Sequence, residues 1–286
     1  MNLWSLNGLS IGELVRRTAY ESWKDSVFGQ GGRMAFYQFL ALFPSLLIFL
    51  AITSRIPHLG GHVSDAAGNL VGEVLPVQAS QILRKMAADL SRHALSGAGW
   101  ISACAGALWA VFNSTWAMIY GLNRAYEVQE HRSRWQMTAT IAVLTLVLGA
   151  IGATAIFLIA GGAYLERHLH REWMALRILE WLILGITVLL FLAVLYRFGP
   201  DVREGKWRWS TPGALCALII WLGSVFAARF YFEYVNDYSR SYGYLNGVAI
   251  LLLWLYVSNG AILIGGEMNS EIEKAGGQDG DADHRS

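Results

Sequence analysis

The chain has 286 residues, a length that allows one or two domains. Hydrophobic residues make up 55% of the chain and charged residues 15%, against about 25% charged in an average soluble domain. The net charge of +1 leaves no excess of Lys and Arg for a nucleic-acid surface. Length, composition and charge together exclude a water-soluble enzyme and argue against nucleic acid as a partner.

Uncharged stretches long enough to cross a membrane recur along the chain. A bilayer core requires about 20 apolar residues in a helix. Five stretches have that length, and a sixth reaches it when Glu180 is included at its end. The stretches are Met34–Ser54, His93–Asn123, Trp135–Leu165, Trp181–Tyr196, Trp209–Ala228 and Ser241–Gly266. They predict an all-α, polytopic membrane protein, with one domain over residues 1–275 that forms a bundle of about six transmembrane helices.

Three segments outside these stretches have patterns of their own. Apolar residues at helical spacing predict an interfacial helix over residues 9–28. Within residues 55–92, Ile82, Leu83, Met86 and Leu90 share one side, opposite polar residues. This pattern predicts an amphipathic helix that lies on the extracytoplasmic surface or packs on the bundle. Residues 276–286 are rich in Gly and Asp, which predicts a disordered cytoplasmic tail.

The distribution of Lys and Arg predicts the orientation in the membrane. Of the 22 basic residues, the larger share falls in the connections on the side of the N-terminus. Cytoplasmic connections of membrane proteins carry such an excess. Both termini are therefore expected in the cytoplasm.

Polar residues that follow the second stretch are candidates for function. Asn123, Arg124, Glu127 and Glu130 come directly after it. If the helix continues beyond the membrane, Asn123, Glu127 and Glu130 share a face, and Arg124 lies within one turn of Glu127. The group is either a salt-bridged helix end or a cytoplasmic gate that binds a proton or a substrate.

Two further groups flank the last stretch. Glu267 ends it beside Gly265 and Gly266, and a loop arginine such as Arg124 or Arg197 is its hypothetical ion-pair partner. At the other end, Tyr242 and Gly243 belong to a tyrosine-rich segment in which the glycine allows a turn or a close approach. Tyrosine side chains of this kind suit a membrane interface.

Inside the spans, a proline and an asparagine stand out. Pro44 removes the backbone hydrogen bond to Leu40 and predicts a kink, which either is structural or lines a pathway. Asn113 is expected to bond across the bundle or to line a cavity, because an unpaired amide is costly in lipid. Tyr37, near the start of the first span, is a further candidate for the lining.

Catalytic and metal-binding patterns are missing from the sequence. It contains no His-Glu-x-x-His, no Gly-x-Ser-x-Gly and no phosphate-binding loop. The two cysteines lie inside predicted spans, where they act as small hydrophobic residues. No cofactor, metal site or enzymatic activity is expected.

With these residues in this order, the chain resembles the YihY/BrkB family of bacterial inner-membrane proteins, once labelled ribonuclease BN. The resemblance runs from about Tyr20 to Ser270. It rests on Ala35–Tyr37 with Phe43-Pro44, Asn123–Tyr126 with Glu130, Tyr196-Arg197 with Pro200, Pro212–Ala214, Tyr242-Gly243, Leu253–Tyr256, and Gly266-Glu267 with Asn269. The chain departs from the family at Gly266 and Met268, where alanine and leucine are usual, and at Leu245-Asn246-Gly247, where Leu-Gly commonly follows the Tyr-Gly pair.

The resemblance implies a six-helix protein of the bacterial inner membrane with both ends in the cytoplasm. Some family members are thought to move lipids or envelope precursors, and the residues above do not support the ribonuclease label. We expect a transporter or flippase-like protein for a lipid or envelope precursor, with membrane lipids as partners. The alternatives are a non-transporting scaffold that binds envelope proteins or a second copy of the chain, and a membrane-embedded enzyme. The candidate pathway residues are Tyr37, Pro44, Asn113, Asn123, Arg124, Glu127, Glu130, Arg197, Tyr242, Gly243, Glu267 and Asn269.

Overall fold

The computed structural model describes residues 6, 8–53, 68–69, 79–81, 83–85, 97–169, 174–202, 211–234 and 239–283. Over these ranges the secondary structure is helical and contains no strand, which confirms the all-α prediction. The helices are α1 (Ile11–Lys24), α2 (Val27–Thr53), α5 (Gly97–Ala125), α6 (Arg134–Leu169), α7 (Met174–Phe198), α8 (Pro212–Tyr234) and α9 (Ser239–Asp283).

The long helices coincide with the predicted membrane stretches. Each helix from α2 to α9 covers most of one of them. Among the described residues, Arg134–Ile159, Ile178–Phe198 and Gly247–Gly276 have both the length and the hydropathy of a membrane span, and Pro212–Ala228 is a shorter apolar helix. The chain is therefore a multi-pass membrane protein.

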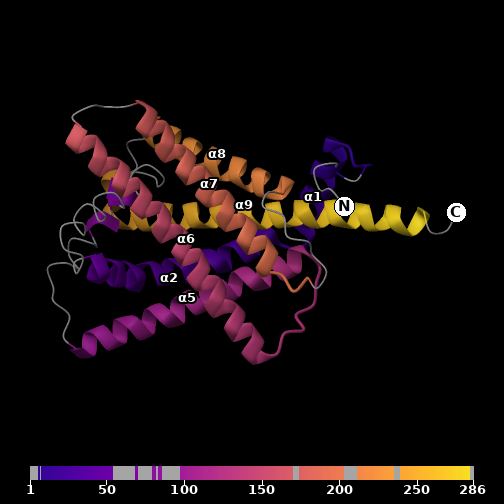
Figure 1. Cartoon of the computed structure of the whole chain (residues 1–286), viewed down its shortest axis with the longest axis horizontal. Helices are drawn as coiled ribbons and strands as arrows, with labels where there is room; N and C mark the ends of the chain where they lie inside the picture. The colour runs from indigo at the N-terminus through magenta and orange to yellow at the C-terminus, as the bar shows by residue number, and fades with distance from the viewer. Residues whose placement is uncertain are drawn as a thin grey trace.

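Helix α9 forms the centre of the bundle. It packs against α2, α8, α1 and α5, while α6 packs mainly on α7. Figure 1 shows α9 running the length of the bundle and projecting beyond it at the end where α1 lies. The connection from α5 to α6 and residues 199–202 after α7 lie at the same end, which we call the terminal end.

The core near the terminal end is packed around α9. Leu122, Leu195 and Leu263, from α5, α7 and α9, are buried together there. Helices α8 and α9 touch through glycines, because a Cβ on Gly213 would overlap the carbonyl of Gly265. Small residues allow such close approach between membrane helices.

Helix α1 lies within the segment expected as an interfacial helix. Ser10 caps its N-terminus by accepting a hydrogen bond from the Glu13 N–H. Leu14 is buried against Ile272 of α9, whereas Val15 and Trp23 on other sides of α1 are exposed. One apolar face of α1 thus packs against α9. Val15 and Trp23 remain exposed and can lie at the membrane interface.

The connection between α2 and α5 falls largely outside the described residues. Of its predicted amphipathic helix, residues 79–81 and 83–85 are helical. Ala79 is buried with Ile250 and Leu251 of α9, and Lys85 is exposed. This part of the segment therefore packs on the bundle, which is one of the two arrangements predicted; the other is a helix on the extracytoplasmic surface.

Helix α9 is longer than the sequence predicts at both ends. Tyr242 and Gly243 lie inside it, so the glycine makes no turn there. The backbone also remains helical up to Asp283, where the sequence predicts a disordered tail from residue 276. Once a helix is nucleated, each further residue adds a backbone hydrogen bond, which lets α9 continue through glycines that would not start a helix.

Candidate functional site

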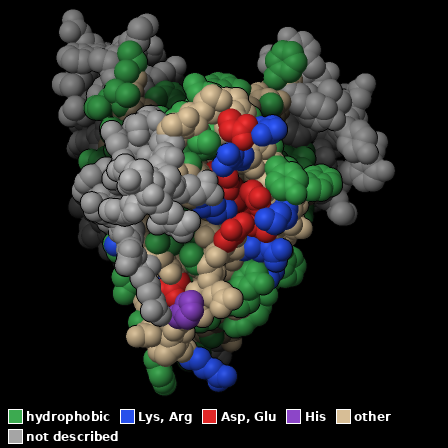
Figure 2. Space-filling view, turned by 90° about the vertical axis from the view of Figure 1, so that its right-hand side faces the viewer, with side chains coloured by type: hydrophobic (Ala, Val, Ile, Leu, Met, Phe, Trp, Pro, Cys, Tyr) green, Lys and Arg blue, Asp and Glu red, His purple; other side chains and the backbone are tan. Residues whose placement is uncertain are grey.

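Charged side chains gather at the terminal end of the bundle. Figure 2 views this end, with red and blue side chains in its middle and hydrophobic side chains around them. Two groups of polar contacts make up the charged area. One ties the α5–α6 connection to the end of α7, and the other lies between α1, α5 and α9.

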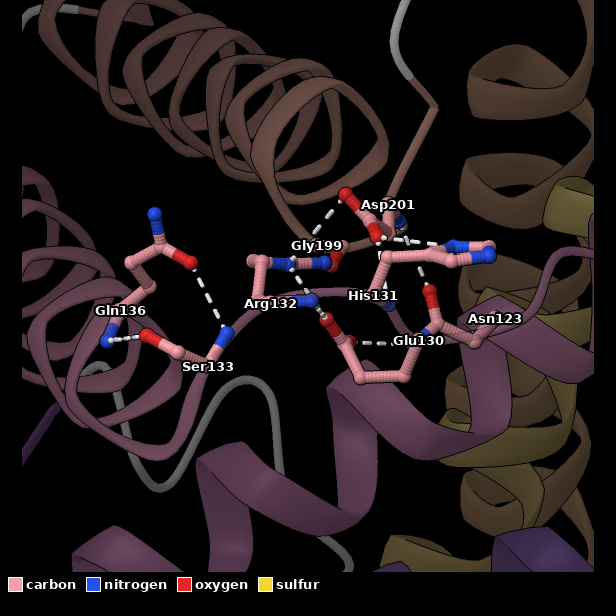
Figure 3. A network of polar contacts seen from close by, with 8 residues as sticks. All are labelled: Asn123, Glu130, His131, Arg132, Ser133, Gln136, Gly199 and Asp201. Carbon is pink, nitrogen blue, oxygen red and sulfur yellow. Dashed lines mark hydrogen bonds and ion pairs between the residues drawn. The ribbon is translucent and has the colours of Figure 1, made fainter.

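The first group, which we call the loop network, consists of Asn123, Glu130, His131, Arg132 and Asp201 (Figure 3). The Asn123 amide donates to Glu130 Oε2 at 2.8 Å, and its Oδ1 accepts from the Asp201 N–H at 2.8 Å. Asp201 Oδ2 in turn accepts from the His131 N–H at 2.8 Å. Asn123, at the end of α5, therefore fixes both connections at once.

Arg132 completes the loop network. Its Nε donates to Glu130 Oε1 at 2.9 Å and lies 3.6 Å from Asp201 Oδ1, and its Nη2 donates to the Gly199 carbonyl at 2.7 Å. The side chain is only 14% exposed. The guanidinium of Arg132 is thus bound by Glu130, Asp201 and the Gly199 carbonyl. Arg132 therefore stabilises the two connections and is not available to bind a ligand.

The chain turns directly from this network into α6. The Ser133 N–H donates to Gln136 Oε1 at 2.8 Å, and the Gln136 N–H donates to Ser133 Oγ at 3.3 Å (Figure 3). This reciprocal pair is a capping box, which satisfies backbone donors that a helix start leaves unpaired.

A pocket of about 510 Å³ lies between α6 and α7 beside the loop network. Leu144 and Val194 at its wall are buried, whereas Val143 and Val147 are exposed at the outer surface of the bundle. Its lining residues are Arg132, Ala139, Thr140, Val143, Leu144, Val147, Val194, Arg197, Phe198, Pro200 and Asp201. The pocket is therefore apolar along the helices and charged at the terminal end.

Arg197 is the cation of this pocket that remains available. It lies in the last turn of α7, with its guanidinium 5.8 Å from the centre of the Phe198 ring. Among the described residues, no carboxylate pairs with it, whereas Arg132, which also lines the pocket, is bound by Glu130, Asp201 and the Gly199 carbonyl. Arginine in such a position binds phosphate or carboxylate groups through its planar fork of N–H donors.

The second group, which we call the acidic junction, joins α1, α5 and α9. Its carboxylates are Glu21, Asp25, Glu127, Glu267 and Glu271, and its cations are Lys24, Arg124 and Lys274. One carboxylate oxygen each of Glu21, Asp25 and Glu127 lies within 4.8 Å of the other two. In the described part of the chain, these three residues are the carboxylates placed closely enough to hold a metal ion.

Glu127 lies between two lysines. Its Oε1 is 3.5 Å from Lys24 Nζ, and its Oε2 is 3.2 Å from Lys274 Nζ. Partial burial acts to raise the pKa of Glu127, but the hydrogen bonds and charges of Lys274 and Lys24 outweigh it and hold the pKa below its ordinary value. Glu127 has a φ of 50° in the turn that ends α5. The helix does not continue past Ala125, so the predicted shared face of Asn123, Glu127 and Glu130 is wrong, although Asn123 and Glu130 do meet.

Glu267 is the most buried carboxylate of the junction. Its side chain is 1% exposed, and neither oxygen has a hydrogen-bonding partner among the described residues. The hypothesis that Arg124 or Arg197 pairs with it is wrong. Arg124 Nε lies 3.5 Å from Asp25 Oδ1 instead, and Arg197 lines the pocket between α6 and α7. The strongest charge interaction of Glu267 is with Asp25.

Residues beside Glu267 hold α8 and α9 together. Asn269 Oδ1 accepts from the Gly213 N–H at 3.0 Å, at the first turn of α8. The Tyr196 hydroxyl donates to the Ile262 carbonyl at 2.7 Å. Tyr126 interacts with Asn269, and burial together with the charges of Glu273 and Glu267 raises the pKa of its hydroxyl. Asn269 is thus placed as a structural residue next to the junction.

The candidates within the spans lie away from the pocket. Tyr37 packs on the core, with its ring centre 6.4 Å from that of Trp109. Pro44 lies inside α2, which continues to Thr53. Asn113 donates to the Trp109 carbonyl of its own helix at 2.7 Å, so the predicted bond across the bundle is wrong for this residue. A helix can satisfy an amide through its own carbonyl four residues earlier.

The structure places polar residues together that the sequence analysis did not select. The amides of Gln38 in α2 and Asn259 in α9 bond each other twice, at 3.0 and 2.8 Å. Asn259, 1% exposed, also donates to the Leu255 carbonyl. An asparagine in the middle of an uncharged stretch was the available signal. Asp25 and Asp201 gave no such signal, because each follows the end of a helix.

Comparisons with known proteins agree with the sequence resemblance. The model of the family described as "Virulence factor BrkB" matches residues 18–286. YfkH of Bacillus subtilis, whose name describes it as ribonuclease-like, is 26% identical over 86% of this chain and 90% of its own length. A UPF0761 membrane protein of Pseudoalteromonas atlantica is 23% identical, over 91% and 85% of the two chains. One from Xanthomonas campestris is 24% identical, and this chain spans 58% of its length. No solved structure matches the chain.

Proposed function

Because the chain belongs to the BrkB family, we propose that this membrane protein binds an anionic lipid or envelope precursor and moves it across the bacterial inner membrane. The terminal end would face the cytoplasm, where the excess of Lys and Arg is expected. The pocket between α6 and α7 would then take the molecule from the cytoplasmic leaflet.

The observation that carries the proposal is the guanidinium of Arg197, which pairs with no described carboxylate, at the charged end of an apolar pocket. A phosphate or carboxylate head group would bind Arg197. The acyl chain of the same molecule would lie along Val143 and Val147, which are open to the outer surface of the bundle. A site with one cationic end and one apolar side suits an amphiphile better than a free anion or a fully apolar ligand.

The loop network supports this assignment because it fixes the charged rim. Arg132 and Asp201 both line the pocket and lie 3.6 Å apart. Glu130 binds the Arg132 guanidinium, and the Asn123 side chain accepts a hydrogen bond from the Asp201 N–H. Hydrogen bonds to both connections keep the rim in one arrangement, so little side-chain freedom is lost when a head group binds.

A lipid-translocation assay tests the proposal. The purified protein is reconstituted into vesicles that contain phosphatidylglycerol labelled on its acyl chain, and the label that remains accessible to an added reductant is followed over time. Vesicles with the protein are expected to exchange the labelled lipid between leaflets faster than vesicles without it. Equal rates would refute transport of this lipid class.

A matched pair of variants tests the site. Arg197→Gln removes the guanidinium of Arg197 from the pocket, whereas Arg134→Gln removes an exposed arginine from the same end of the bundle. We expect Arg197→Gln to slow exchange and Arg134→Gln to leave it unchanged. Equal effects of the two variants would show that only the net charge of this end matters.

A membrane scaffold is the second candidate function, and the outward face of α6 favours it. A Cβ on Gly149 or Gly152 would meet nothing within 4 Å, and Ala153 is exposed. A partner helix can approach closely at such positions. If vesicles with the protein show no exchange while Gly149→Leu disrupts a complex isolated from membranes, the scaffold is the better description.

A further inference from the structure

Among the described residues, the carboxylates of the acidic junction outnumber the cations that form ion pairs with them. Lys24, Arg124 and Lys274 form ion pairs with four of its five carboxylates, while Arg17 acts on Glu271 and Lys274 on Glu267 only as more distant charges. The lysines are used by Glu21, Glu127 and Glu271, with Nζ–O distances of 2.7 to 3.5 Å. Asp25 has the 3.5 Å contact with Arg124, and Glu267 forms no ion pair or hydrogen bond with any described residue.

The unpaired oxygens of these two residues are buried. Asp25 Oδ2 and both oxygens of Glu267 have no hydrogen-bonding partner among the described residues. Asp25 is 9% exposed and Glu267 is 1% exposed. Of the charged residues that act on Glu267, Asp25 has the largest effect. A buried carboxylate without a partner is costly, and two that face each other repel as well.

Hydroxyl oxygens of α1 line the same face. Ser22 and Thr18 lie about one and two turns before Asp25, are buried, and have hydroxyl groups without a partner in the described structure. Only oxygen atoms are therefore unsatisfied on this face of α1. Hard cations such as Ca²⁺ and Mg²⁺ prefer oxygen ligands of this kind.

The geometry of the acid residues also fits a cation. One oxygen each of Glu21, Asp25 and Glu127 lies within 4.8 Å of the other two, and Glu267 interacts with all three of these carboxylates. Metal–oxygen distances of about 2.3–2.6 Å allow Ca²⁺ to bridge atoms with this separation. We propose that the acidic junction binds one divalent cation, held by Glu21, Asp25 and Glu127, with Glu267 as the buried counter-charge behind them.

The lysines compete with the cation for these ligands. Lys24 Nζ lies 2.7 Å from Glu21 Oε2 and 3.5 Å from Glu127 Oε1, so the divalent ion displaces this ammonium group when it binds. Removal of Lys24 should therefore strengthen cation binding. If the junction were only a group of structural salt bridges, removal of Lys24 would not be expected to increase its affinity for a cation.

The test is a titration of the purified full-length protein in detergent, after treatment with a chelator, with CaCl₂ and with MgCl₂ in a calorimeter. Saturable binding of one Ca²⁺ or Mg²⁺ per chain is expected. Asp25→Asn and Glu267→Gln should each weaken it by at least about tenfold, because each removes one charge from the site. Glu13→Gln, which removes a carboxylate that pairs with Arg16 and Arg17 on α1, should leave it unchanged.

The Lys24→Gln variant should bind the ion more tightly than the natural chain. Because this expected result is a gain of affinity, misfolding of the variant cannot produce it. Absence of saturable binding for both ions overturns the proposal, as does wild-type affinity in Asp25→Asn or in Glu267→Gln. The result is independent of lipid exchange, so a failure here leaves the proposed function standing, and the reverse also holds.

Discussion

The reciprocal amide pair between Gln38 and Asn259 should couple α2 to α9 energetically. We consider the replacement of each residue by leucine, alone and together. Asn259→Leu removes two hydrogen bonds between the helices and leaves the amide of the half-buried Gln38 without these bonds. Each hydrogen bond between membrane helices contributes about 0.6 kcal/mol on average, and up to about 1.7 kcal/mol. The single replacement should therefore cost about 1–3 kcal/mol.

The double variant should cost less than the sum of the two single variants. Once Asn259 is leucine, the Gln38 amide has lost both bonds already, so its own replacement removes little more. A coupling energy of about 1–2 kcal/mol is expected from the two shared bonds. The assay is the free energy of unfolding in mixed detergent micelles, measured for the natural chain, both single variants and the double variant.

A matched control separates this pair from an asparagine that bonds within its own helix. Asn113→Leu makes the same chemical change, but its amide bonds only the Trp109 carbonyl of its own helix. It should show no coupling to Gln38→Leu. If the costs of Gln38→Leu and Asn259→Leu add within about 0.5 kcal/mol, the amide pair does not join the two helices in solution and the reasoning is refuted.

Three further outcomes follow from the packing and charges at the terminal end. Gly213→Ala should lower the free energy of unfolding by about 1–3 kcal/mol, because its Cβ overlaps the facing carbonyl of α9, whereas Gly223→Ala, with open space around it, should change it by less than about 0.5 kcal/mol. Equal effects would contradict the close contact. Asn123→Ala should release both connections of the loop network and increase cleavage between residues 126 and 133 in limited proteolysis, and an unchanged cleavage rate would argue against its bridging role. The folded-state pKa of Glu127 is held below its ordinary value by the two lysines, so its contribution to stability is present above the unfolded-state pKa near 4.5 and is lost as the pH falls through the lower folded-state pKa. Unfolding temperatures measured at a series of acidic pH values should therefore fall less steeply in Glu127→Gln than in the natural chain, and identical curves would contradict this.

The polar contacts at the terminal end were predicted only in part. Asn123 and Glu130 do meet, but through a reversal of the chain after Ala125 and not along a continued helix. The spacing of residues on a helix applies only while the helix lasts. Where it ends depends on which side chains and carbonyls are available in space to satisfy the last turn, and here these come from Asp201 and Gly199 of another connection.

The interactions of Glu267 show the same limit. An uncharged stretch that ends in a carboxylate places Glu267 near the end of the bundle, yet it does not say which residue faces it. The sequence suggested an arginine, because opposite charges attract. The packing of α1 on α9 puts Asp25, Thr18 and Ser22 on that side instead. No pattern within one segment reports on which two distant helices will share a face.

The sequence by itself determined that the chain crosses the membrane repeatedly as helices, because a backbone in lipid must satisfy its own hydrogen bonds and the uncharged stretches have the length of a bilayer. It also determined the family, through short motifs in a fixed order. Only the tertiary structure decided that α9 lies at the centre, that Arg197 lines an apolar pocket, and that carboxylates at the ends of α1 and α5 come together beside Glu267 of α9. The physical reason is that hydropathy acts along one helix at a time, whereas pairing of charges and amides depends on contacts between helices distant in the chain.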